Sequence, residues 1–276
     1  MSYPLGFPSA HPLVTVTHPT PTSWLIEMHN GDDSRFTEQF VSHALMPALD
    51  AVERHWRENW RAARAAKDKN GGRGTLVLVG KRGQNKFFSN GLDYDNLIKD
   101  PHFQTNFFPL VFNPLMRRLL TFPIPTVAAI NGHCFAGAFG LSMCCDYRVM
   151  TDGSSRNAWL SMNEVHFGAG WPLSFAGVFR SKVQDAKVLR KIALEGHRFT
   201  PQEALEAGLV DRIVKGDTET IIDKARQVGE AASAMSVSGV WGVIKRDLYR
   251  DALEASERSV QQVNVFSDDA AAKARL

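Results

Sequence analysis

Two short, almost wholly apolar segments restrict the fold more than any other feature of this chain. TLVLVG (75–80) is bounded by glycines, and TVAAI (126–130) follows the turn-forming sequence FPIP. An uninterrupted apolar strand of this kind is typical of the middle of a sheet that is covered on both faces. A third run, YRVM (147–150), comes directly after a glycine-rich segment that resembles a helix. Strands and helices therefore alternate along the chain, which predicts a layered α/β fold.

The regions on either side of these strands predict a hairpin and several helices. Residues 13–29 contain two alternating runs around a Pro/Thr turn, which indicates a β-hairpin or two edge strands. Thr37 opens a long helical pattern that ends at residues 70–74. From Gln184 onward the pattern is helical throughout, and the final helices cover about 218–272.

Residues 199–214 carry the clearest signal for the ends of a helix. Thr200 fits the N-cap and Pro201 the first helical position. Glu203 completes a capping box with Thr200, and Gly208 supplies the C-terminal stop. We therefore expect a short, well-capped helix between these positions.

Charge and composition exclude several classes of function. The 276 residues fit one large domain or one domain with a helical appendage. A net charge of +3 with 22% charged residues gives no strongly basic field, so we expect no nucleic-acid partner. Cys134, Cys144 and Cys145 form no CxxC pair and indicate neither a disulfide framework nor a metal site. No apolar run reaches 18 residues, so we expect a soluble, intracellular protein without a membrane span.

Gly137 and Gly140 lie inside a segment, NGHCFAGAFGLSMCCDY (131–147), that otherwise resembles a buried helix. Each glycine in a helix costs about 0.5–1 kcal/mol relative to alanine, so two need a reason in packing or chemistry. KFFSNGLDY (86–94) places another glycine turn after a buried strand. At the carboxyl ends of strands, backbone N–H groups can bind an anionic oxygen. The two turns could share one oxygen, although tight turns without a ligand explain the spacing equally well.

Two familiar catalytic motifs are absent from the sequence. GTLVLVGK (74–81) lacks the glycine spacing of a phosphate-binding loop and the Ser or Thr that follows its lysine. No GxSxG elbow occurs, and the nine histidines are scattered, which argues against a Ser/His/Asp hydrolase.

Four ordered motifs resemble those of the crotonase family, also called the enoyl-CoA hydratase/isomerase superfamily. They are KFFSNGLD, IPTVAAINGHCFAGAFGLSMCCDYRV, LSMNEVHFGAGWP and TPQEALEAGLVDRIV. Within the family the chain is most similar to the peroxisomal Δ3,Δ2-enoyl-CoA isomerases of plants and fungi. The resemblance implies a crotonase-like α/β spiral of ββα units over 13–215 and a C-terminal helical trimerisation region over 216–276. It also implies a homotrimer or homohexamer acting on acyl-CoA thioesters, with coenzyme A as part of the substrate and no separate cofactor.

The resemblance also assigns site residues. In this family two backbone N–H groups hold the thioester oxygen, and here they fall at Leu92 and Gly137. The neighbouring substrate-binding positions are Phe88, Ser89, Asn90, Gly91 and Gly140. Hydratases of the family carry one glutamate at the position of Gly140 and a second one later in the chain. Only the second is present here, as Glu164, and one carboxylate suffices to move a proton.

The implied reaction is the shift of a double bond from 3-enoyl-CoA to 2-enoyl-CoA. Glu164 removes the proton from C2 and returns it at C4, while Leu92 and Gly137 stabilise the dienolate oxygen. A hydratase that works with one glutamate and a non-catalytic acyl-CoA-binding paralogue remain as alternatives. Relatives that hydrolyse 3-hydroxyisobutyryl-CoA share the glycine, but the aspartate they place eight residues after the glutamate is Pro172 here.

Other side chains in these motifs have structural interpretations. Three polar residues are expected to support the fold rather than react: His166, Asp146 and Asp93. Three aromatic residues fit either an acyl pocket or the core: Trp159, Phe88 and Phe139. The segment 95–120 is rich in Phe and Leu, which predicts either core and subunit contacts or a tunnel for a sizeable acyl tail.

The last three residues suggest a cellular address. Ala274, Arg275 and Leu276 follow the small, basic, leucine pattern of the peroxisomal S-K-L tail. The sequence therefore predicts recognition by the peroxisomal import receptor, with the cytoplasm as the alternative location.

Overall fold

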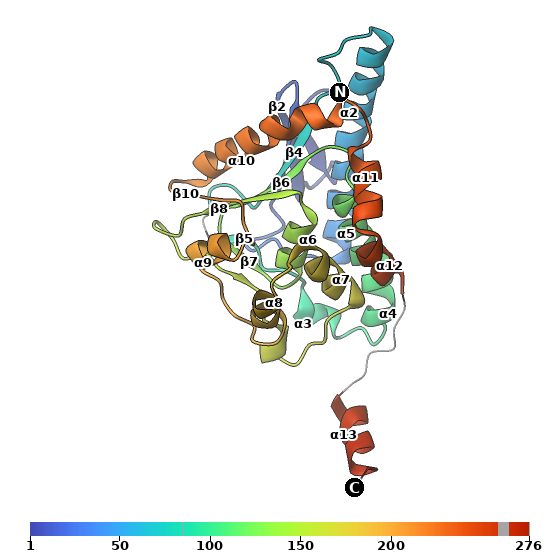
Figure 1. Cartoon of the computed structure of the whole chain (residues 1–276), viewed down its shortest axis with the longest axis vertical. Helices are drawn as coiled ribbons and strands as arrows, with labels where there is room; N and C mark the ends of the chain where they lie inside the picture. The colour runs from blue at the N-terminus through green and yellow to red at the C-terminus, as the bar shows by residue number, and fades with distance from the viewer. Residues whose placement is uncertain (85, 259–264, 276) are drawn as a thin grey trace.

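A mixed sheet forms the centre of the molecule (Figure 1). The computed structural model describes residues 1–84, 86–258 and 265–275. In this part of the chain, seven strands pair in the order β1-β2-β3-β4-β6-β8-β10. They are β1 (Leu5–Phe7), β2 (Val14–Thr20), β3 (Ser23–Met28), β4 (Thr75–Val79), β6 (Thr126–Ile130), β8 (Tyr147–Thr151) and β10 (Arg212–Val214). The β1-β2 and β2-β3 pairs are antiparallel, and the later pairs are parallel.

A smaller sheet of three parallel strands lies beside the central one. Its strands are β5 (Phe87–Ser89), β7 (His133–Phe135) and β9 (Leu160–Ser161). Each follows one long strand along the chain: β5 follows β4, β7 follows β6, and β9 follows β8. Because the three short strands are parallel and adjacent, the loops at their carboxyl ends meet at one edge of the small sheet.

Helices cover both faces of the central sheet. The N-terminal group is α1 (Glu38–Phe40), η1 (Val41–Leu45), α2 (Met46–Ala65), α3 (Tyr94–Leu97), α4 (Phe103–Phe107), η2 (Phe108–Phe112), α5 (Asn113–Leu120) and α6 (Gly137–Cys144). The C-terminal group is η3 (Glu164–His166), α7 (Leu173–Lys182), α8 (Ala186–Ala193), α9 (Pro201–Glu206), α10 (Thr218–Ala232), η4 (Ser233–Ser236), α11 (Trp241–Leu248), α12 (Arg250–Glu257) and α13 (Val265–Lys273). None of these described helices combines the length and apolar character needed to cross a bilayer.

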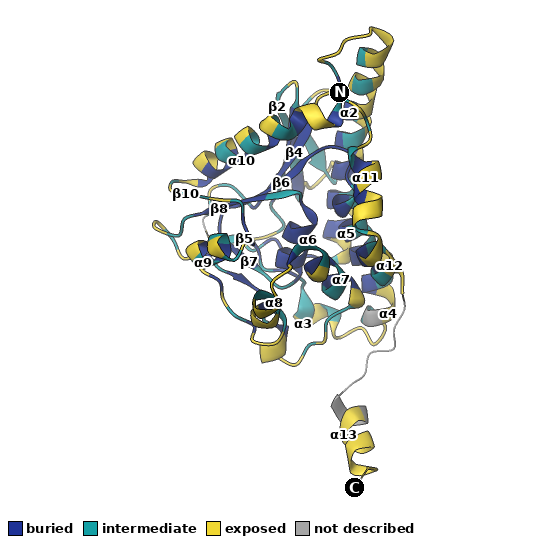
Figure 2. Ribbon diagram, viewed as in Figure 1, coloured by how far each residue is buried: buried dark blue, intermediate teal, exposed yellow. Residues whose placement is uncertain are grey.

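The core follows from the apolar strands that the sequence contains. Every residue of β4 and β6 is buried, as predicted for strands covered on both faces (Figure 2). On one face, Ile221, Ile222 and Ala225 of α10 pack against the sheet. The opposite face carries the larger apolar cluster, which includes α2, α5 and α6.

Most of the predicted elements are confirmed, and one expectation is wrong. Residues 13–29 form the β2-β3 hairpin. Thr37 caps the predicted helix by accepting a hydrogen bond from the Phe40 N–H, and the capping box of α9 is present. The chain after Gln184 is not helical throughout, because β10 adds a parallel strand to the edge of β8. This strand has only three residues, and pairing along the open edge of β8 provides partners for its backbone that local propensity does not reveal.

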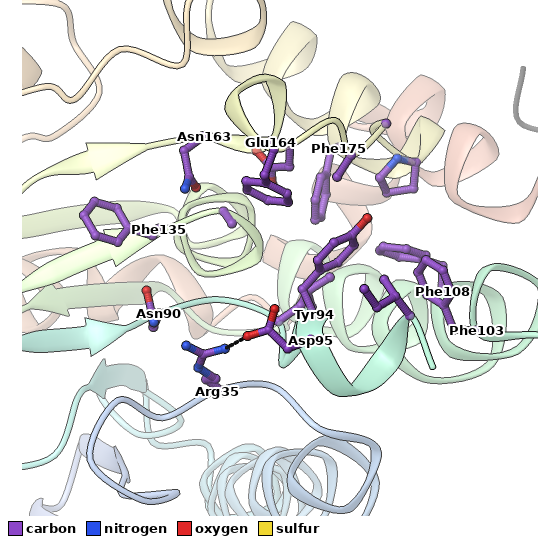
Figure 3. A pocket seen from close by; sticks show the side chains of 17 residues that line it. Arg35, Asn90, Tyr94, Asp95, Phe103, Phe108, Phe135, Asn163, Glu164 and Phe175 are labelled. Atoms are coloured by element: carbon purple, nitrogen blue, oxygen red, sulfur yellow. Dashed lines mark ion pairs between the residues drawn. The ribbon is translucent and has the colours of Figure 1, made fainter. Parts of the chain in front are cut away.

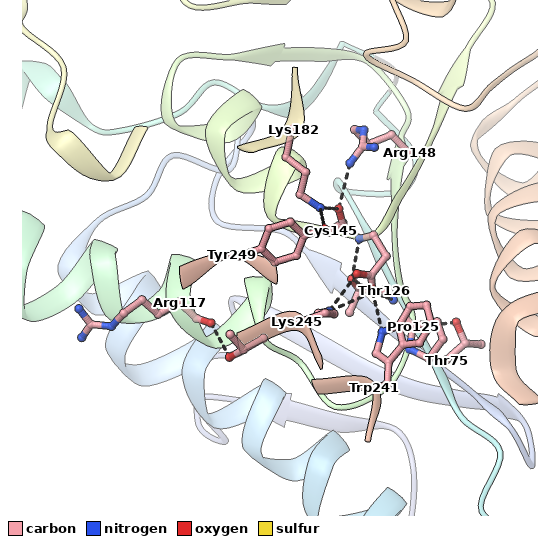
Figure 4. A network of polar contacts seen from close by, with 12 residues as sticks. Thr75, Arg117, Pro125, Thr126, Cys145, Arg148, Lys182, Trp241, Lys245 and Tyr249 are labelled. Carbon is pink, nitrogen blue, oxygen red and sulfur yellow. Dashed lines mark hydrogen bonds and ion pairs between the residues drawn. The ribbon is translucent and has the colours of Figure 1, made fainter. Parts of the chain in front are cut away.

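A buried ion pair attaches the C-terminal helices to the sheet (Figure 4). Lys245 on α11 lies 2.9 Å from the carboxylate of Asp146, and their side chains are only 5% and 8% exposed. The same carboxylate accepts hydrogen bonds from the Thr126 N–H and from the Trp241 indole N–H. Removing one partner of such a pair typically costs about 3–5 kcal/mol, since a buried charge is left uncompensated. Asp146 therefore has a structural role.

Candidate active site

A cavity of about 310 Å³ lies where the three strands of the small sheet end (Figure 3). Asn90 and Leu92 follow β5, Ala136 follows β7, and Asn163 and Glu164 follow β9. The α3, α4, η2 and α7 regions supply much of the remaining wall, with the aromatic side chains of Tyr94, Phe103, Phe108 and Phe175. The repeated strand pairs of the fold thus bring three loops that are far apart in sequence to one site.

The two glycine turns predicted to share an oxygen are in close contact. Gly91 has a φ of +80°, and a Cβ built there would lie 2.6 Å from the Phe135 carbonyl oxygen and 3.1 Å from the Gly137 nitrogen. Only glycine fits such a backbone, because both the conformation and the space exclude a side chain. In the described part of the chain, neither the Leu92 N–H nor the Gly137 N–H donates to a protein group. Both donors are therefore free for a ligand.

Side chains below the first turn hold it in shape. The Ser89 hydroxyl donates to the Ser34 carbonyl oxygen (2.7 Å) and accepts from the Gly91 N–H (3.2 Å). The Asn90 amide donates to the Asp33 carboxylate at 3.0 Å, and Asn90 also lines the cavity. Ser89 is fully buried, and Phe88 is buried in the main core, so both support the turn from behind the cavity wall.

Glu164 presents a buried carboxylate to the cavity. It begins the short η3 turn, and hydrogen bonds from the N–H groups of Phe167 and Ala169 to its carbonyl oxygen fix the backbone. Glu164 is 6% exposed, and its Oε2 atom has no hydrogen-bond partner among the described residues. Burial raises the pKa of Glu164 to about 7, although its backbone N–H and the Trp171 side chain offset part of this rise. Such a carboxylate can both accept and return a proton near neutral pH.

A second carboxylate lines the cavity but differs in its surroundings. The Asp95 side chain is 83% exposed and lies 3.6 Å from the Arg35 guanidinium at the cavity mouth, as Figure 3 shows. The Arg35 guanidinium also forms an ion pair with the Asp33 carboxylate, at 2.9 Å. Among the described residues that line the cavity, Glu164 is thus the one buried carboxylate.

Gly140 lies in α6 behind an aromatic ring. It is buried, and a Cβ built at this position would lie 3.3 Å from two ring carbons of Phe175. Phe175 lines the cavity together with Glu164, whereas Gly140 does not reach it. The ring therefore separates Gly140 from the space in which a substrate would lie.

The segment 95–120 contributes to both the cavity and the core. Phe103 and Phe108 line the cavity, while Phe107 and Phe112 lie in the main apolar cluster. Phe108 belongs to both, so the core interpretation holds for this segment, and the acyl tunnel stays a prediction. Leu110 is 70% exposed and belongs to neither.

Phe139, Trp159 and His166 lie outside the cavity. Phe139 is fully buried against Phe179, with ring centroids 5.0 Å apart. Trp159 stacks on His133 at 4.7 Å. His166 is exposed, and its Nε2 lies 3.2 Å from the Gly196 carbonyl oxygen. Each thus has a structural contact of its own.

Among the described residues, neither a cluster of metal ligands nor a cysteine lines the cavity. Across the residues that the structure describes, no three His, Cys, Asp or Glu side chains gather as metal ligands. Cys134, Cys144 and Cys145 are fully buried, and burial raises the pKa of all three thiols. The ionisable side chains that line the cavity are therefore Glu164, Asp95, Arg35 and Tyr94.

Comparison with known proteins assigns the fold to a family. The Enoyl-CoA hydratase/isomerase family model matches residues 51–267. The chain belongs to this family. The α/β crotonase fold expected from the four motifs is therefore confirmed, and it includes the C-terminal helices.

Relatives of this crotonase-family protein include isomerases and hydratases. Enoyl-CoA delta isomerase 2, peroxisomal, of Arabidopsis thaliana is 30% identical over 183 residues, which cover 64% of this chain and 74% of that protein. The apo structure of an enoyl-CoA isomerase of Mycobacterium tuberculosis superposes with a TM-score of 0.69 at 22% identity, covering 88% of this chain and 94% of that one. An enoyl-CoA hydratase of Mycobacterium marinum gives a TM-score of 0.68 at 23% identity with the same coverage. The fold is thus similar to that of proteins with either name.

Sequence reasoning missed much of the cavity wall, including Arg35, Tyr94 and Phe175. Arg35 and Tyr94 line it near the mouth, and Phe175 lines it beside Glu164. Arg35 lies in a loop far from the recognised motifs, so only the fold brings it to the cavity. Phe175 follows the motif that contains Glu164, but its contact with Gly140 joins separate helices and leaves no periodic signal.

Proposed function

We propose that the protein is an enoyl-CoA isomerase that converts 3-enoyl-CoA to 2-enoyl-CoA, with Glu164 as its proton carrier. The observation that carries this proposal is the single buried carboxylate in a cavity lined by Leu92 and Ala136, next to two backbone N–H groups, those of Leu92 and Gly137, that have no acceptor among the described residues. The nearest rival is a hydratase that works with the same single glutamate. A paralogue that binds acyl-CoA without reacting is the third possibility.

The mechanism requires a thioester oxygen at the two glycine turns. The N–H groups of Leu92 and Gly137 donate to this oxygen, and they bind it more strongly as it gains negative charge. Glu164 removes a proton from C2, and the electron pair of that bond forms the dienolate. The same carboxylic acid then delivers the proton to C4, which leaves the double bond between C2 and C3 in conjugation with the carbonyl. A pKa near 7 suits Glu164 to both steps.

The aromatic wall supports a reaction from which water is excluded. Phe103, Phe108 and Phe175 line part of the cavity with carbon, while Arg35, Asn90 and Asn163 supply polar groups elsewhere on its wall. Exclusion of water strengthens the interaction of the oxyanion with its two donors. In addition, Gly140 has no side chain that could hold a water for addition.

The test is an assay of purified protein with a trans-3-enoyl-CoA in deuterated water. We expect the double bond to shift to C2 and deuterium to enter at C2 and C4. Glu164→Gln should reduce both by at least about 10²-fold while acyl-CoA still binds. Asp95→Asn is the matched control, because Asp95 is the other carboxylate at the cavity, and it should keep most activity.

Three results contradict this assignment. Rapid formation of 3-hydroxyacyl-CoA from trans-2-enoyl-CoA would identify a hydratase. Loss of activity in Asp95→Asn with retention in Glu164→Gln would move the proton carrier to Asp95. Binding of acyl-CoA without double-bond shift, water addition or deuterium exchange would identify a non-catalytic paralogue.

The oligomer that we propose is a homotrimer or a homohexamer assembled through the C-terminal helices over 216–276. An exposed apolar strip on and next to α11 supports this proposal. Its members are Val240, Val243, Ile244 and Leu248, which are 45–66% exposed. Their spacing puts them on one face of a helix, where a partner subunit could cover them. Light scattering should give a trimer or hexamer, and Ile244→Glu should reduce its mass.

We further propose that the protein is imported into peroxisomes by its C-terminal tripeptide. Ala274 and Arg275 are exposed, and Leu276 lies outside the described residues. Receptor recognition requires such an accessible tail. A fluorescent protein carrying the last ten residues should enter peroxisomes, and deletion of the tripeptide should leave it in the cytosol. Cytosolic fluorescence from both fusions would refute the proposal.

A further inference from the structure

We infer that Phe175 determines the reaction specificity of this site by occupying the place that a second catalytic carboxylate would need. The inference rests on the proposed isomerase function and adds a physical reason for it. The absence of a glutamate at position 140 is then only half of the reason that water is not added. The other half is a ring that fills the space between α6 and the cavity.

The contact between Gly140 and Phe175 leaves no room for a long side chain. The Cδ1 and Cε1 atoms of Phe175 both lie 3.3 Å from the Cβ position of residue 140, and Cζ lies 3.9 Å from it. A Cβ at 3.3 Å is already tight, and a glutamate must extend three heavy atoms beyond Cβ to bring its carboxylate into the cavity. The Phe175 ring occupies the space into which a side chain at position 140 would extend.

The ring cannot easily turn away, because other aromatic rings hold it. Phe108, Phe112 and Trp171 each meet Phe175 edge to face, at centroid distances of 6.1, 5.9 and 6.3 Å. Phe175 is only 2% exposed. Edge-to-face pairs of this kind prefer their geometry, so the ring is fixed by its neighbours rather than by one contact.

The location of the ring decides what can happen beside Glu164. Hydration adds the oxygen of water to C3 and a proton to C2, so it requires a water held close to the reacting carbons and a base that takes its proton. Phe175 lines the same cavity as Glu164 and presents the carbon atoms of its ring to it, in front of the one position, residue 140, from which a second carboxylate would have to extend. Proton transfer between C2 and C4 needs no such water. The ring thus blocks addition and permits the double-bond shift.

The inference makes a specific claim about double substitution. Gly140→Glu alone should not give a hydratase, because its carboxylate cannot pass the ring. Phe175→Ala alone opens space but supplies no second base. Only the pair Gly140→Glu and Phe175→Ala should raise water addition to trans-2-enoyl-CoA, by about 10²-fold relative to the parent, which is typical of one general base. Each single variant should give less than about tenfold, well below that contribution.

A matched control separates this effect from a general loosening of the core. Phe179 lies one turn further along α7, is fully buried, packs on Phe139 and does not line the cavity. Phe179→Ala combined with Gly140→Glu should lose stability without gaining hydration. Phe175→Leu combined with Gly140→Glu serves as a milder change if Phe175→Ala fails to fold, with a thermal melt of each variant to verify folding.

The outcomes are distinct. A gain of hydration in Gly140→Glu alone that equals the gain in the double variant would overturn the inference, as would folded double variants with no gain at all. The gain should disappear when Glu164→Gln is added. Failure of the isomerase proposal is seen separately, as absence of double-bond shift in the parent protein, and does not depend on any Phe175 variant.

Discussion

Glu164→Gln should make the folded protein more stable while it removes activity. Burial raises the pKa of Glu164 from 4.5 to about 7, which means that the folded state binds the proton more tightly than the unfolded chain. The free energy of unfolding therefore decreases as the pH rises from 4.5 toward 7, and this loss persists at higher pH. Glutamine keeps the shape of the side chain and has no charge to bury.

The size of the effect follows from the pKa. At about 1.4 kcal/mol per pKa unit, a rise from 4.5 to about 7 corresponds to about 3 kcal/mol above pH 8. The same arithmetic gives less than about 1 kcal/mol at pH 5, because that pH lies only slightly above the pKa of the unfolded glutamate and the folded state is still protonated. A group that is 6% exposed is weakly screened by solvent, so the full amount applies as an order of magnitude.

Urea denaturation of both proteins at pH 5 and pH 8 measures this difference. The protein concentration has to be equal in all experiments, because subunit association also contributes to stability. Glu257→Gln, at an exposed position, is the control and should show no pH-dependent gain. If Glu164→Gln is no more stable than the parent at pH 8, or gains equally at both pH values, then the carboxylate is not desolvated as described.

Three further predictions concern the site and its support. The kcat/KM for isomerisation should rise about tenfold from pH 6 to pH 8 with a midpoint near 7, because the base must be ionised; a flat pH profile would contradict the assignment of Glu164. Gly91→Ala should reduce kcat/KM by at least about 10²-fold by displacing the Leu92 N–H, and Gly31→Ala, which has open space around it, should not. In a Glu164→Gln background, stability should decrease as the pH falls from 7 to 5. His55 Nδ1 accepts from the Trp24 indole N–H at 3.2 Å, burial lowers the pKa of His55 below 6.5, and the neutral form is thus favoured on folding. His55→Gln should weaken this pH dependence, as measured by thermal unfolding.

The strands and the first helix were predictable because their signals are local. TLVLVG and TVAAI are apolar without interruption and bounded by turn residues, so burial on both faces follows directly from composition. Thr37 and Thr200 cap the N-termini of helices, because each side chain accepts a hydrogen bond from the backbone N–H three residues later. By contrast, β10 has three residues, and Arg212 within it is exposed, so pairing with a distant strand alone determines its conformation.

The site was predictable only in part, and for a similar reason. The family motifs point to Leu92, Gly137 and Glu164, and the fold brings these three segments to one cavity. The burial of Glu164, from which its pKa follows, depends on walls supplied by α3, η2 and α7 and could not be derived from the motif. The contact of Phe175 with Gly140 is likewise a product of how α6 meets α7, which one sequence does not encode in any short pattern.

The ion pair between Asp146 and Lys245 also affects the order in which the molecule can fold during synthesis. The two residues are 99 positions apart, and the Trp60 indole reaches the Val237 carbonyl oxygen across 177 positions. A nascent chain that ends after β10 lacks Lys245, the partner of Asp146, and it lacks α10, which covers one face of the sheet. We expect this nascent chain to need protection by chaperones until α10 and α11 emerge. Premature termination before α11 should therefore yield aggregated chains rather than a smaller folded protein.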